Sequence, residues 1–379
     1  MAAMEKNNKN LNVPNLRFPE FSGEWTETTI GECCSELEYG MNAPSKYFDG
    51  VNKYIRITDI DEQTSEYKQD SVVSPDAPLE DKYIVKDRDI LFARTGASTG
   101  KTYIYNPQDG KMYYAGFLIR ANVKIEDNPK FVFYQTQTHR YKKWVSIMSM
   151  RSGQPGINSQ EYASYKFWKP CKDEQDKISA LISLLDTRIQ TQKKIIEKYE
   201  SLIRGLCEKL TRQGDANKSI NECLECHSST LQESEILDTG RYPVYGAIGV
   251  CGYTNTPDVS GDGILIIKDG ASVGVTYFAD GCYSSIGTLN RLTAKQGINL
   301  RYVYYYLKVM NFAPYKTGLA IPHIYFKDYG KHKIWCPSFE QQSRIADALI
   351  NIDNKIHVEK SLLEQLNSQK RYMLNQLFI

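Results

Sequence analysis

The second half of the sequence repeats the first, and this duplication limits the possible folds more than any other feature. Residues 171–212, within the segment 171–213, align without a gap on residues 338–379 at an offset of 167 positions (338 minus 171). The aligned stretches and their borders share identical residues at Pro170/Pro337, Gln175/Gln342, Asp186/Asp353, Lys193/Lys360 and Glu197/Glu364. A gap-free match of this length indicates duplication rather than chance, so both halves are predicted to fold in the same way.

The repeat continues upstream, with small changes in offset that insertions in loops would cause. The segment RTGASTGKTYIY, which begins at Arg94, matches KDGASVGVTYFA, which begins at Lys268, at an offset of 174 (268 minus 94). QPGI, whose proline is Pro155, matches IPHI, whose proline is Pro322. Each half is therefore predicted to be a globular block followed by one long helix.

Both long helices carry apolar residues at steps of four and three, which is the heptad pattern of a coiled coil. The predicted seam consists of Ile178, Ile182, Leu185, Ile189, Ile196, Ile203, Leu206, Ile345, Leu349, Ile352, Ile356, Leu363, Leu366 and Met373. Gln192 and Glu359 occupy equivalent seam positions, where a polar residue can fix the register. Two equivalent halves associate most simply about a two-fold axis, which would make the helices antiparallel. Two amphipathic helices on separate cores are the alternative.

The blocks alternate short β-rich runs with helical stretches, which is typical of a mixed α/β structure. We predict an α+β fold with a pseudo-two-fold internal repeat, in which two mixed α/β blocks are separated by a pair of long helices forming an antiparallel coiled coil. The predicted boundaries are residues 1–170 for the first block, 171–213 for the first helix, 214–337 for the second block and 338–379 for the second helix.

The net charge of +2 gives no argument for a nucleic-acid partner, but the distribution of charge does. No acidic residue occurs between Asp127 and Glu161 or between Asp280 and Asp328, although lysine and arginine recur in both stretches. A surface that approaches phosphates favours cations and excludes carboxylates, since each carboxylate adds repulsion. Two such stretches in matching places favour DNA binding. Chance clustering on a solvated face is the alternative.

The candidate DNA contacts are the cationic and hydrogen-bonding side chains of these stretches and of the two Gly-Ala-Ser turns. In the first half they are Arg94, Ser98, Lys101, Tyr141, Lys142, Lys143, Arg151 and Gln154. In the second half they are Lys268, Ser272, Arg291, Lys316, His323 and Lys327. The small residues of each turn let a backbone approach a ligand closely. A tight turn between paired strands is the structural alternative.

Other motifs do not support catalysis or metal binding. The segment from Gly96 to Thr102 resembles a phosphate-binding loop, but it has three residues between its glycines where that motif needs four. Cys223-x-x-Cys226-His227 lacks further ligands at suitable spacing, so we expect free cysteines and no metal. We find no methyltransferase, hydrolase or metalloprotease motif. These absences favour a binding protein over an enzyme.

Two further features bear on location. No apolar run reaches the ~18 residues that a membrane helix needs, so no membrane contact is expected. Nine cysteines without framework spacing favour reduced thiols. We therefore expect a cytoplasmic protein.

The duplicated helices, introduced by KPCKDEQDKI and CPSFEQQSRI, together with the opening NVPNLRFPEFSGEWTETTIGE, resemble the specificity subunits of type I restriction–modification systems. The resemblance covers essentially the whole chain. It implies that the blocks are target-recognition domains, each reading one half of a bipartite double-stranded DNA site. Because Lys101 has no counterpart and Arg94 is replaced by Lys268, the contacts of the two halves need not be equivalent.

The resemblance also implies a set of partners. The helices would dock two methyltransferase (modification) subunits, and motor-nuclease restriction subunits would join this core. S-adenosylmethionine and ATP with magnesium would belong to these partners, so no cofactor is expected on this chain, which would be a non-catalytic DNA-recognition subunit. A coiled-coil scaffolding protein without DNA readout is the alternative.

Overall fold

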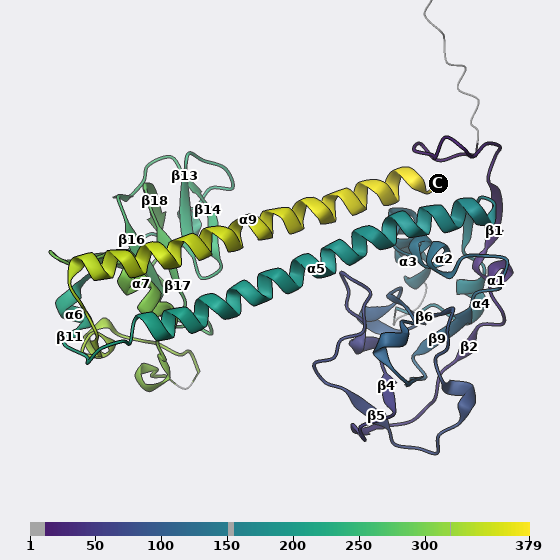
Figure 1. The fold of residues 1–379 in the computed structure, drawn as a ribbon, viewed down its shortest axis with the longest axis horizontal. Coiled ribbons are helices and arrows are strands. Elements are labelled where there is room, and N and C mark those ends of the chain that lie inside the picture. Colours follow the sequence, from purple (N-terminus) through teal and green to yellow (C-terminus); the bar gives the residue numbers. More distant parts are fainter. Residues whose placement is uncertain (1–11, 151–154, 319) are drawn as a thin grey trace, which may run out of the picture. The chain divides into compact units, whose positions relative to one another are not determined.

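The computed structural model describes residues 12–150, 155–318 and 320–379 (Figure 1). The chain divides into two compact units, one formed by residues 1–190 with 364–379 and the other by residues 191–363. We call them unit 1 and unit 2. Each contains one globular block and a part of both long helices, α5 (Lys172–Leu210) and α9 (Phe339–Leu377).

The block of unit 1 is built around a four-stranded antiparallel sheet in the order β2-β9-β6-β7. Every residue of β6 is buried, and Leu91 at its centre lies opposite Tyr103 on one side and Arg120 on the other. The strands are β1 (Thr26–Thr29), β2 (Glu38–Tyr39), β3 (Ser45–Tyr47), β4 (Lys53–Ile55), β5 (Val73–Pro75), β6 (Asp89–Ala93), β7 (Thr102–Ile104), β8 (Met112–Tyr114), β9 (Leu118–Asn122) and β10 (Lys166–Lys169). The helices are α1 (Ile30–Cys33), α2 (Pro129–Gln135), α3 (His139–Ser149) and α4 (Ser159–Ala163).

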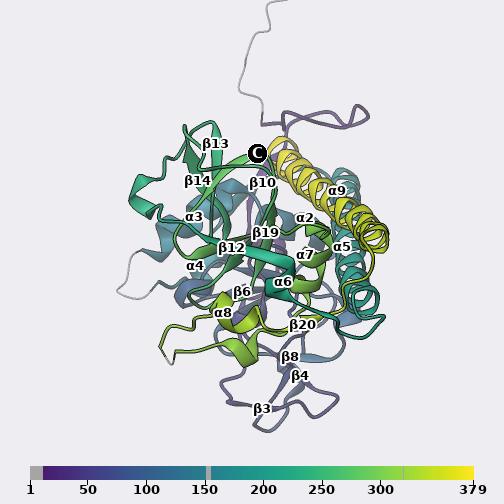
Figure 2. The same cartoon turned by 90° about the vertical axis from the view of Figure 1, so that its left-hand side faces the viewer.

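The block of unit 2 repeats this sheet in the order β12-β19-β16-β17 and adds a second sheet, β14-β13-β18-β15. Figure 2 shows β12 beside β19, with α6 at the end of β12. The strands are β11 (Lys218–Ser219), β12 (Leu224–Ser228), β13 (Tyr242–Gly246), β14 (Gly249–Thr254), β15 (Val259–Ser260), β16 (Gly263–Ile267), β17 (Thr276–Ala279), β18 (Cys282–Ser285), β19 (Leu289–Ala294) and β20 (Lys333–Ile334). The helices are α6 (Ile220–Cys223), α7 (Leu300–Lys308) and α8 (Phe326–Tyr329).

The two long helices pair antiparallel, as the sequence predicts. In unit 1 the beginning of α5, at Ile178 and Ile182, shares a core with the end of α9, at Leu374 and Leu377. In unit 2 the end of α5 shares a core with the beginning of α9. Among the predicted seam residues, Leu206, Ile352, Leu363 and Met373 are half-buried and the others are buried.

The seam residues also belong to the cores of the blocks. Ile178 and Ile182 pack with Phe131 of the first block, and Ile203 packs with Tyr302 of the second. The alternative of two amphipathic helices on separate cores is therefore correct in part. The apolar stripe that joins the two helices also packs against the core of a block. The predicted fold class, with mixed α/β blocks and an internal repeat, is confirmed.

A repeated glutamine connects each helix to its block. The Gln175 amide oxygen accepts a hydrogen bond from Asn128 N at 2.9 Å, and its nitrogen donates to Pro170 O at 3.1 Å. Gln342 makes the same two contacts, with Asn299 N at 2.8 Å and with the carbonyl of Pro337 at 2.9 Å. Asn128 and Asn299 cap α2 and α7. The Pro…Gln motif that both halves share therefore joins the start of a long helix to the start of a block helix.

A repeated aspartate makes a second connection further along each helix. The Tyr134 hydroxyl donates to Asp186 at 2.7 Å in unit 1, and the Tyr305 hydroxyl donates to Asp353 at 3.1 Å in unit 2. Lys308 adds an ion pair with Asp353 at 3.2 Å. Because both connections recur, each helix is oriented on its block in the same way. Within the described residues, no helix is long and apolar enough to cross a membrane.

Candidate nucleic-acid interface

Two equivalent hairpin turns carry the Gly-Ala-Ser sequences. We call residues 94–100 turn 1 and residues 268–274 turn 2. Turn 1 joins β6 to β7 and turn 2 joins β16 to β17, and each hairpin is closed by a backbone hydrogen bond of 2.9 Å, Gly100 N to Ala93 O and Gly274 N to Ile267 O. The closing glycines have φ values of +88° and +93°, a region that side chains other than glycine rarely adopt. The glycines are therefore required by the turn itself, so the structural alternative holds for them.

A second segment packs against each turn in the same way. Gly96 N donates to Pro155 O at 2.9 Å, and Ile157 N donates to Arg94 O at 2.9 Å. In unit 2, Gly270 N donates to Pro322 O at 2.9 Å and Ile324 N donates to Lys268 O, also at 2.9 Å. The two short motifs that recur in the sequence are thus neighbours in space. Together, a turn and its proline segment form one two-part surface in each block.

Two buried tyrosines lie beneath turn 1. The Tyr162 hydroxyl donates to Ala93 O at 2.7 Å and accepts from Gly100 N at 3.1 Å. The Tyr141 hydroxyl donates to Gly100 O at 3.2 Å. Tyr141 is only 1% exposed, so the prediction that it contacts DNA is wrong. Its ring packs between Trp144 and Tyr165 in the core, and burial raises the pKa of its hydroxyl well above the usual range.

The other predicted contacts of the first half differ in how exposed they are. The Arg94 guanidinium lies 4.8 Å from the ring centroid of the exposed Tyr39, and the two side chains form a cation–π pair. Lys101 forms an ion pair with Glu62 at 3.3 Å, so part of its charge is already neutralised. Ser98 is half-buried, whereas Lys142 and Lys143 on α3 are exposed. Arg151 and Gln154 lie outside the described residues.

The predicted residues around turn 2 differ in chemistry. His323 Nδ1 lies 2.7 Å from Asp269 Oδ1, so the imidazole is engaged within the surface. Lys268 is half-buried, and Ser272 is exposed on the turn. Lys316 and Lys327 are exposed, and neither forms an ion pair within the described part of the chain.

Arg291 is not at a turn. It is half-buried in β19, between His227 of β12 and Leu265 of β16. Its side-chain carbons also lie close to Gly263, whose missing side chain leaves room for them. The side chain therefore lines the sheet rather than turn 2.

The acid-free stretches are less free of carboxylates in space than in sequence. Lys308 pairs with Asp353 of α9, and Arg301 pairs with Asp280 at 3.4 Å. Arg301 also lies 3.7 Å from the ring centroid of Phe278. These two cations serve the packing of unit 2, so the candidate phosphate contacts reduce to the cations that remain exposed.

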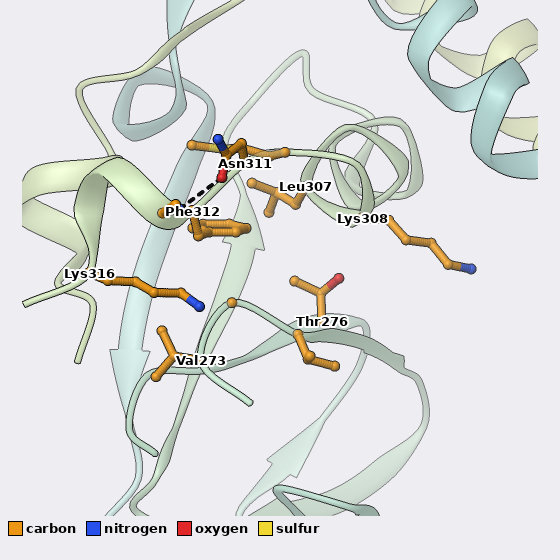
Figure 3. Close-up of a pocket in the computed structure, with 11 residues that line it drawn as sticks. Val273, Thr276, Leu307, Lys308, Asn311, Phe312 and Lys316 are labelled. Atoms are coloured by element: carbon orange, nitrogen blue, oxygen red, sulfur yellow. Dashed lines mark hydrogen bonds between the residues drawn. The ribbon is translucent and has the colours of Figure 1, made fainter. Parts of the chain in front are cut away.

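A pocket of about 380 Å³ opens beside turn 2 (Figure 3). Its walls come from turn 2, from the start of β17 and from the segment after α7, with Val273, Phe312 and Lys316 among its residues. Figure 3 shows Lys316 extending along the side of the pocket near Val273. The pocket thus belongs to the surroundings of turn 2.

The cysteines offer no metal centre in the described part of the chain. All nine are free thiols there, and no group of three potential ligands gathers around an ion-sized site. Cys223 is buried, and the imidazole of His227 hydrogen-bonds to Thr293 at 2.9 Å. Cys226 and His227 are residues of β12, and His227 takes part in the packing of its sheet.

Sequence reasoning missed Tyr39 and Tyr162. Tyr39 comes from a two-residue strand far from turn 1 in the sequence, and its hydroxyl accepts a hydrogen bond from Ser159 N at 3.1 Å. Burial would raise its pKa, but the hydrogen bond from Ser159 and the nearby Arg94 lower it overall. Tyr162 has a tyrosine, Tyr329, at the equivalent position of the second half, and this identity in the repeat is the sequence signal that could have found it.

Comparison with known proteins places this architecture in a family. A family model described as the type I restriction modification DNA specificity domain matches residues 23–201 and again residues 216–368. These two matches cover well over half of the chain, which therefore belongs to this family. Within a type I restriction–modification system, it is the specificity subunit, with two target-recognition domains.

Individual relatives and structures agree. The MjaVIII specificity subunit of Methanocaldococcus jannaschii is 24% identical over 418 residues, covering 96% of this chain and 93% of that protein. The EcoprrI specificity subunit of Escherichia coli is 28% identical over 112 residues, 30% of this chain and 28% of that one. The crystal structure of a type I S subunit from M. genitalium matches with a TM-score of 0.66 at 19% identity, over 97% of this chain and 99% of that chain. A chain from a structural study of type I complex assembly matches with a TM-score of 0.54 at 16% identity, over 93% and 97%.

Proposed function

We propose that each block reads one half of a bipartite DNA site through its turn and the adjoining proline segment. The observation that carries this proposal is that the same two-part surface occurs in both blocks with different side chains. Arg94, Thr95 and Thr99 in turn 1 are replaced by Lys268, Asp269 and Val273 in turn 2. A constant backbone with variable side chains suits two readers of different sequences.

We further propose that the chain itself catalyses nothing. Methylation would come from two modification subunits that carry S-adenosylmethionine, and cleavage from restriction subunits that use ATP with magnesium. The long helices support this arrangement, because they expose large apolar side chains that a partner could cover. Leu184 on α5 is 60% exposed, and Val358 and Tyr372 on α9 are 58% and 59% exposed.

Exchange of one block tests the readout. Residues 20–170 are replaced by the corresponding block of a relative, and the methylated motif is read by methylome sequencing in cells that contain the modification subunits. We expect only one half of the motif to change, because the second block is untouched. A change in both halves would show that the blocks do not read independently.

Salt-dependent binding tests which cations contact phosphate. We expect Lys142→Ala and Lys143→Ala each to weaken binding to all sequences and to reduce the salt slope by about one unit. Lys308→Ala, whose charge is paired within unit 2, is the matched control and should leave the slope unchanged. Unchanged slopes in all three variants would place the DNA surface elsewhere.

A charge on the helix surface tests docking. Val358→Asp should reduce co-purification of the modification subunits with the chain, because a carboxylate would be buried at the contact. Exposed Lys194 on α5 provides the control variant Lys194→Asp, which removes no apolar surface. Equal recovery of modification subunits with Val358→Asp and the unaltered chain would contradict docking at this place.

A further inference from the structure

The two turns are held from beneath in different ways. At turn 1, three hydrogen bonds from two buried hydroxyls reach the backbone, from Tyr162 to Ala93 O at 2.7 Å, from Gly100 N to Tyr162 at 3.1 Å and from Tyr141 to Gly100 O at 3.2 Å. Tyr162 is fully buried and Tyr141 is 1% exposed. Both ends of the hairpin closure are therefore bonded to side chains whose own positions are fixed by the core.

Turn 2 lacks this arrangement. Phe312 takes the place of Tyr141 at the offset of 171 (312 minus 141) that relates Tyr134 to Tyr305, and it has no hydroxyl. Tyr329 takes the place of Tyr162, but its hydroxyl makes no hydrogen bond to any residue of turn 2. The rings still pack together, with the centroids of Phe312 and Tyr329 5.6 Å apart. Apolar contact therefore replaces the hydrogen bonds.

The space around turn 2 also differs. The pocket of about 380 Å³ lies directly against Val273 and Gly274 of the turn, with Phe312 on the opposite wall (Figure 3). A β-carbon at Gly100 of turn 1 would stand 2.4 Å from Val145, and one at Gly274 of turn 2 would stand 2.8 Å from Phe312, so both closing glycines pack against a side chain. The turns differ in that buried hydroxyls bond to the closure of turn 1, whereas turn 2 borders a pocket.

We propose that the hydroxyls of Tyr141 and Tyr162 are positioning groups that pre-organise turn 1 for base readout, and that turn 2 is the more adaptable reader. This inference rests on the proposed function, in which the turns face DNA. A reader held in one conformation loses affinity sharply when a wrong base displaces its hydrogen bonds, whereas an adaptable reader can shift to keep some of them. The half-site read by block 1 is therefore discriminated more strictly than the half-site read by block 2.

Removal of single hydroxyls tests the proposal in the complete complex with its modification subunits. DNA duplexes carry the full motif, one wrong base in the half-site of block 1, or one wrong base in the half-site of block 2. Block exchange assigns the half-sites. Tyr162→Phe should reduce discrimination at the first half-site by about fivefold to tenfold, since it removes two hydrogen bonds from the turn closure. Tyr141→Phe should have a smaller effect in the same direction. Tyr329→Phe, which removes a hydroxyl without contact to a turn, is the matched control.

The reciprocal variant adds a hydroxyl to the second half. Phe312→Tyr faces the pocket beside turn 2 and should sharpen discrimination at the second half-site. Equal discrimination in Tyr162→Phe and the unaltered chain, or an equal loss at both half-sites, would overturn the proposal, because a general loss indicates only weaker folding. If Tyr162→Phe does not fold, the test rests on Phe312→Tyr alone. Sharper discrimination at the second half-site would then support the proposal, and unchanged discrimination would overturn it.

One further variant separates this inference from the proposed function. Ser98→Asp places a carboxylate on turn 1, where DNA phosphates would repel it. If Ser98→Asp leaves DNA binding unchanged, turn 1 does not face DNA and the proposed function fails. If Ser98→Asp abolishes binding while Tyr162→Phe keeps full discrimination, the function stands and the positioning role is overturned.

Discussion

Removal of the Gln175 side-chain amide should destabilise unit 1 markedly. The amide is 1% exposed and makes three hydrogen bonds, accepting from Asn128 N and donating to Pro170 O and to Asp127 Oδ1, the last at 2.9 Å. Gln175→Leu preserves the approximate volume but leaves the Asn128 N–H and the Pro170 carbonyl without these partners. Each unsatisfied buried group costs about 1–3 kcal/mol. Asp127 keeps its ion pair with Lys169 at 2.7 Å, so we add nothing for it.

For two such groups the expected loss is therefore about 2–6 kcal/mol, which for a unit of this size lowers the melting temperature by roughly 5–25 °C. Urea unfolding followed by tryptophan fluorescence measures it, because Trp25, Trp144 and Trp168 lie in unit 1 and only Trp335 lies in unit 2. Gln369→Leu, at an exposed position of α9, is the control for an added leucine. A loss below about 0.5 kcal/mol, within the range of ordinary surface substitutions, would refute the anchoring role of Gln175.

Three further predictions follow from the helices and turns. The Gln192 side chain donates to Glu359, the residue at the equivalent position of the repeat. Gln192→Glu should lower the urea midpoint at pH 7, because it places two carboxylates side by side, and the additional substitution Glu359→Gln should restore the midpoint. An unchanged midpoint in the single variant would contradict this. Burial alone would raise the pKa of Asp127, but the hydrogen bonds from Lys169 and Gln175 lower it overall. Because the pKa of Asp127 is lower in the folded chain than in the unfolded one, the ion pair stabilises the fold fully above about pH 4, and this stabilisation decreases as the pH falls toward and through the folded pKa. The effect of Lys169→Met on the urea midpoint should therefore be smaller at pH 3 than at pH 7. Replacement of residues 94–100 by the sequence of residues 268–274 should leave the melting temperature nearly unchanged but alter the methylated motif in one half only.

The helices and the duplication could be predicted from sequence because both depend on local periodicity. A seam that repeats every three or four residues over several turns has no strand interpretation, and the offset of 167 identifies equivalent residues without any knowledge of their contacts. The antiparallel pairing follows from the same symmetry. Strand order was not predictable, because β9 pairs with both β2 and β6, and such pairings depend on long-range contacts that no short pattern records.

The candidate site could be predicted only in outline. The glycine turns and their proline segments were visible, since backbone requirements leave glycine and proline at fixed places. Exposure cannot be read from the sequence, so Tyr141 is among the predicted DNA contacts although its ring lies in the core, as its position beside Trp144 also allowed. Lys101 is among the predicted contacts and Lys308 lies in an acid-free stretch, but both are paired, with Glu62 and Asp353, which lie far away in the sequence. Ion pairing depends on the fold, which a count of charges along the chain does not contain.

Two of the contacts that both halves share, those of the repeated glutamine and of the proline segment, are directed at the backbone, and this explains how a duplicated chain can read two different sequences. Gln175 and Gln342 contact backbone N–H and carbonyl groups, and the proline segments contact the turns through backbone atoms. Such contacts do not depend on the side chains of the residues that they hold. Substitutions on the outer face of a turn therefore change the reader without disturbing its support. The hydroxyls beneath the turns differ between the halves, because Tyr141 and Tyr162 bond to turn 1 whereas Phe312 has no hydroxyl and the hydroxyl of Tyr329 bonds to no residue of turn 2. It is there that the two readers should differ in stringency as well as in sequence.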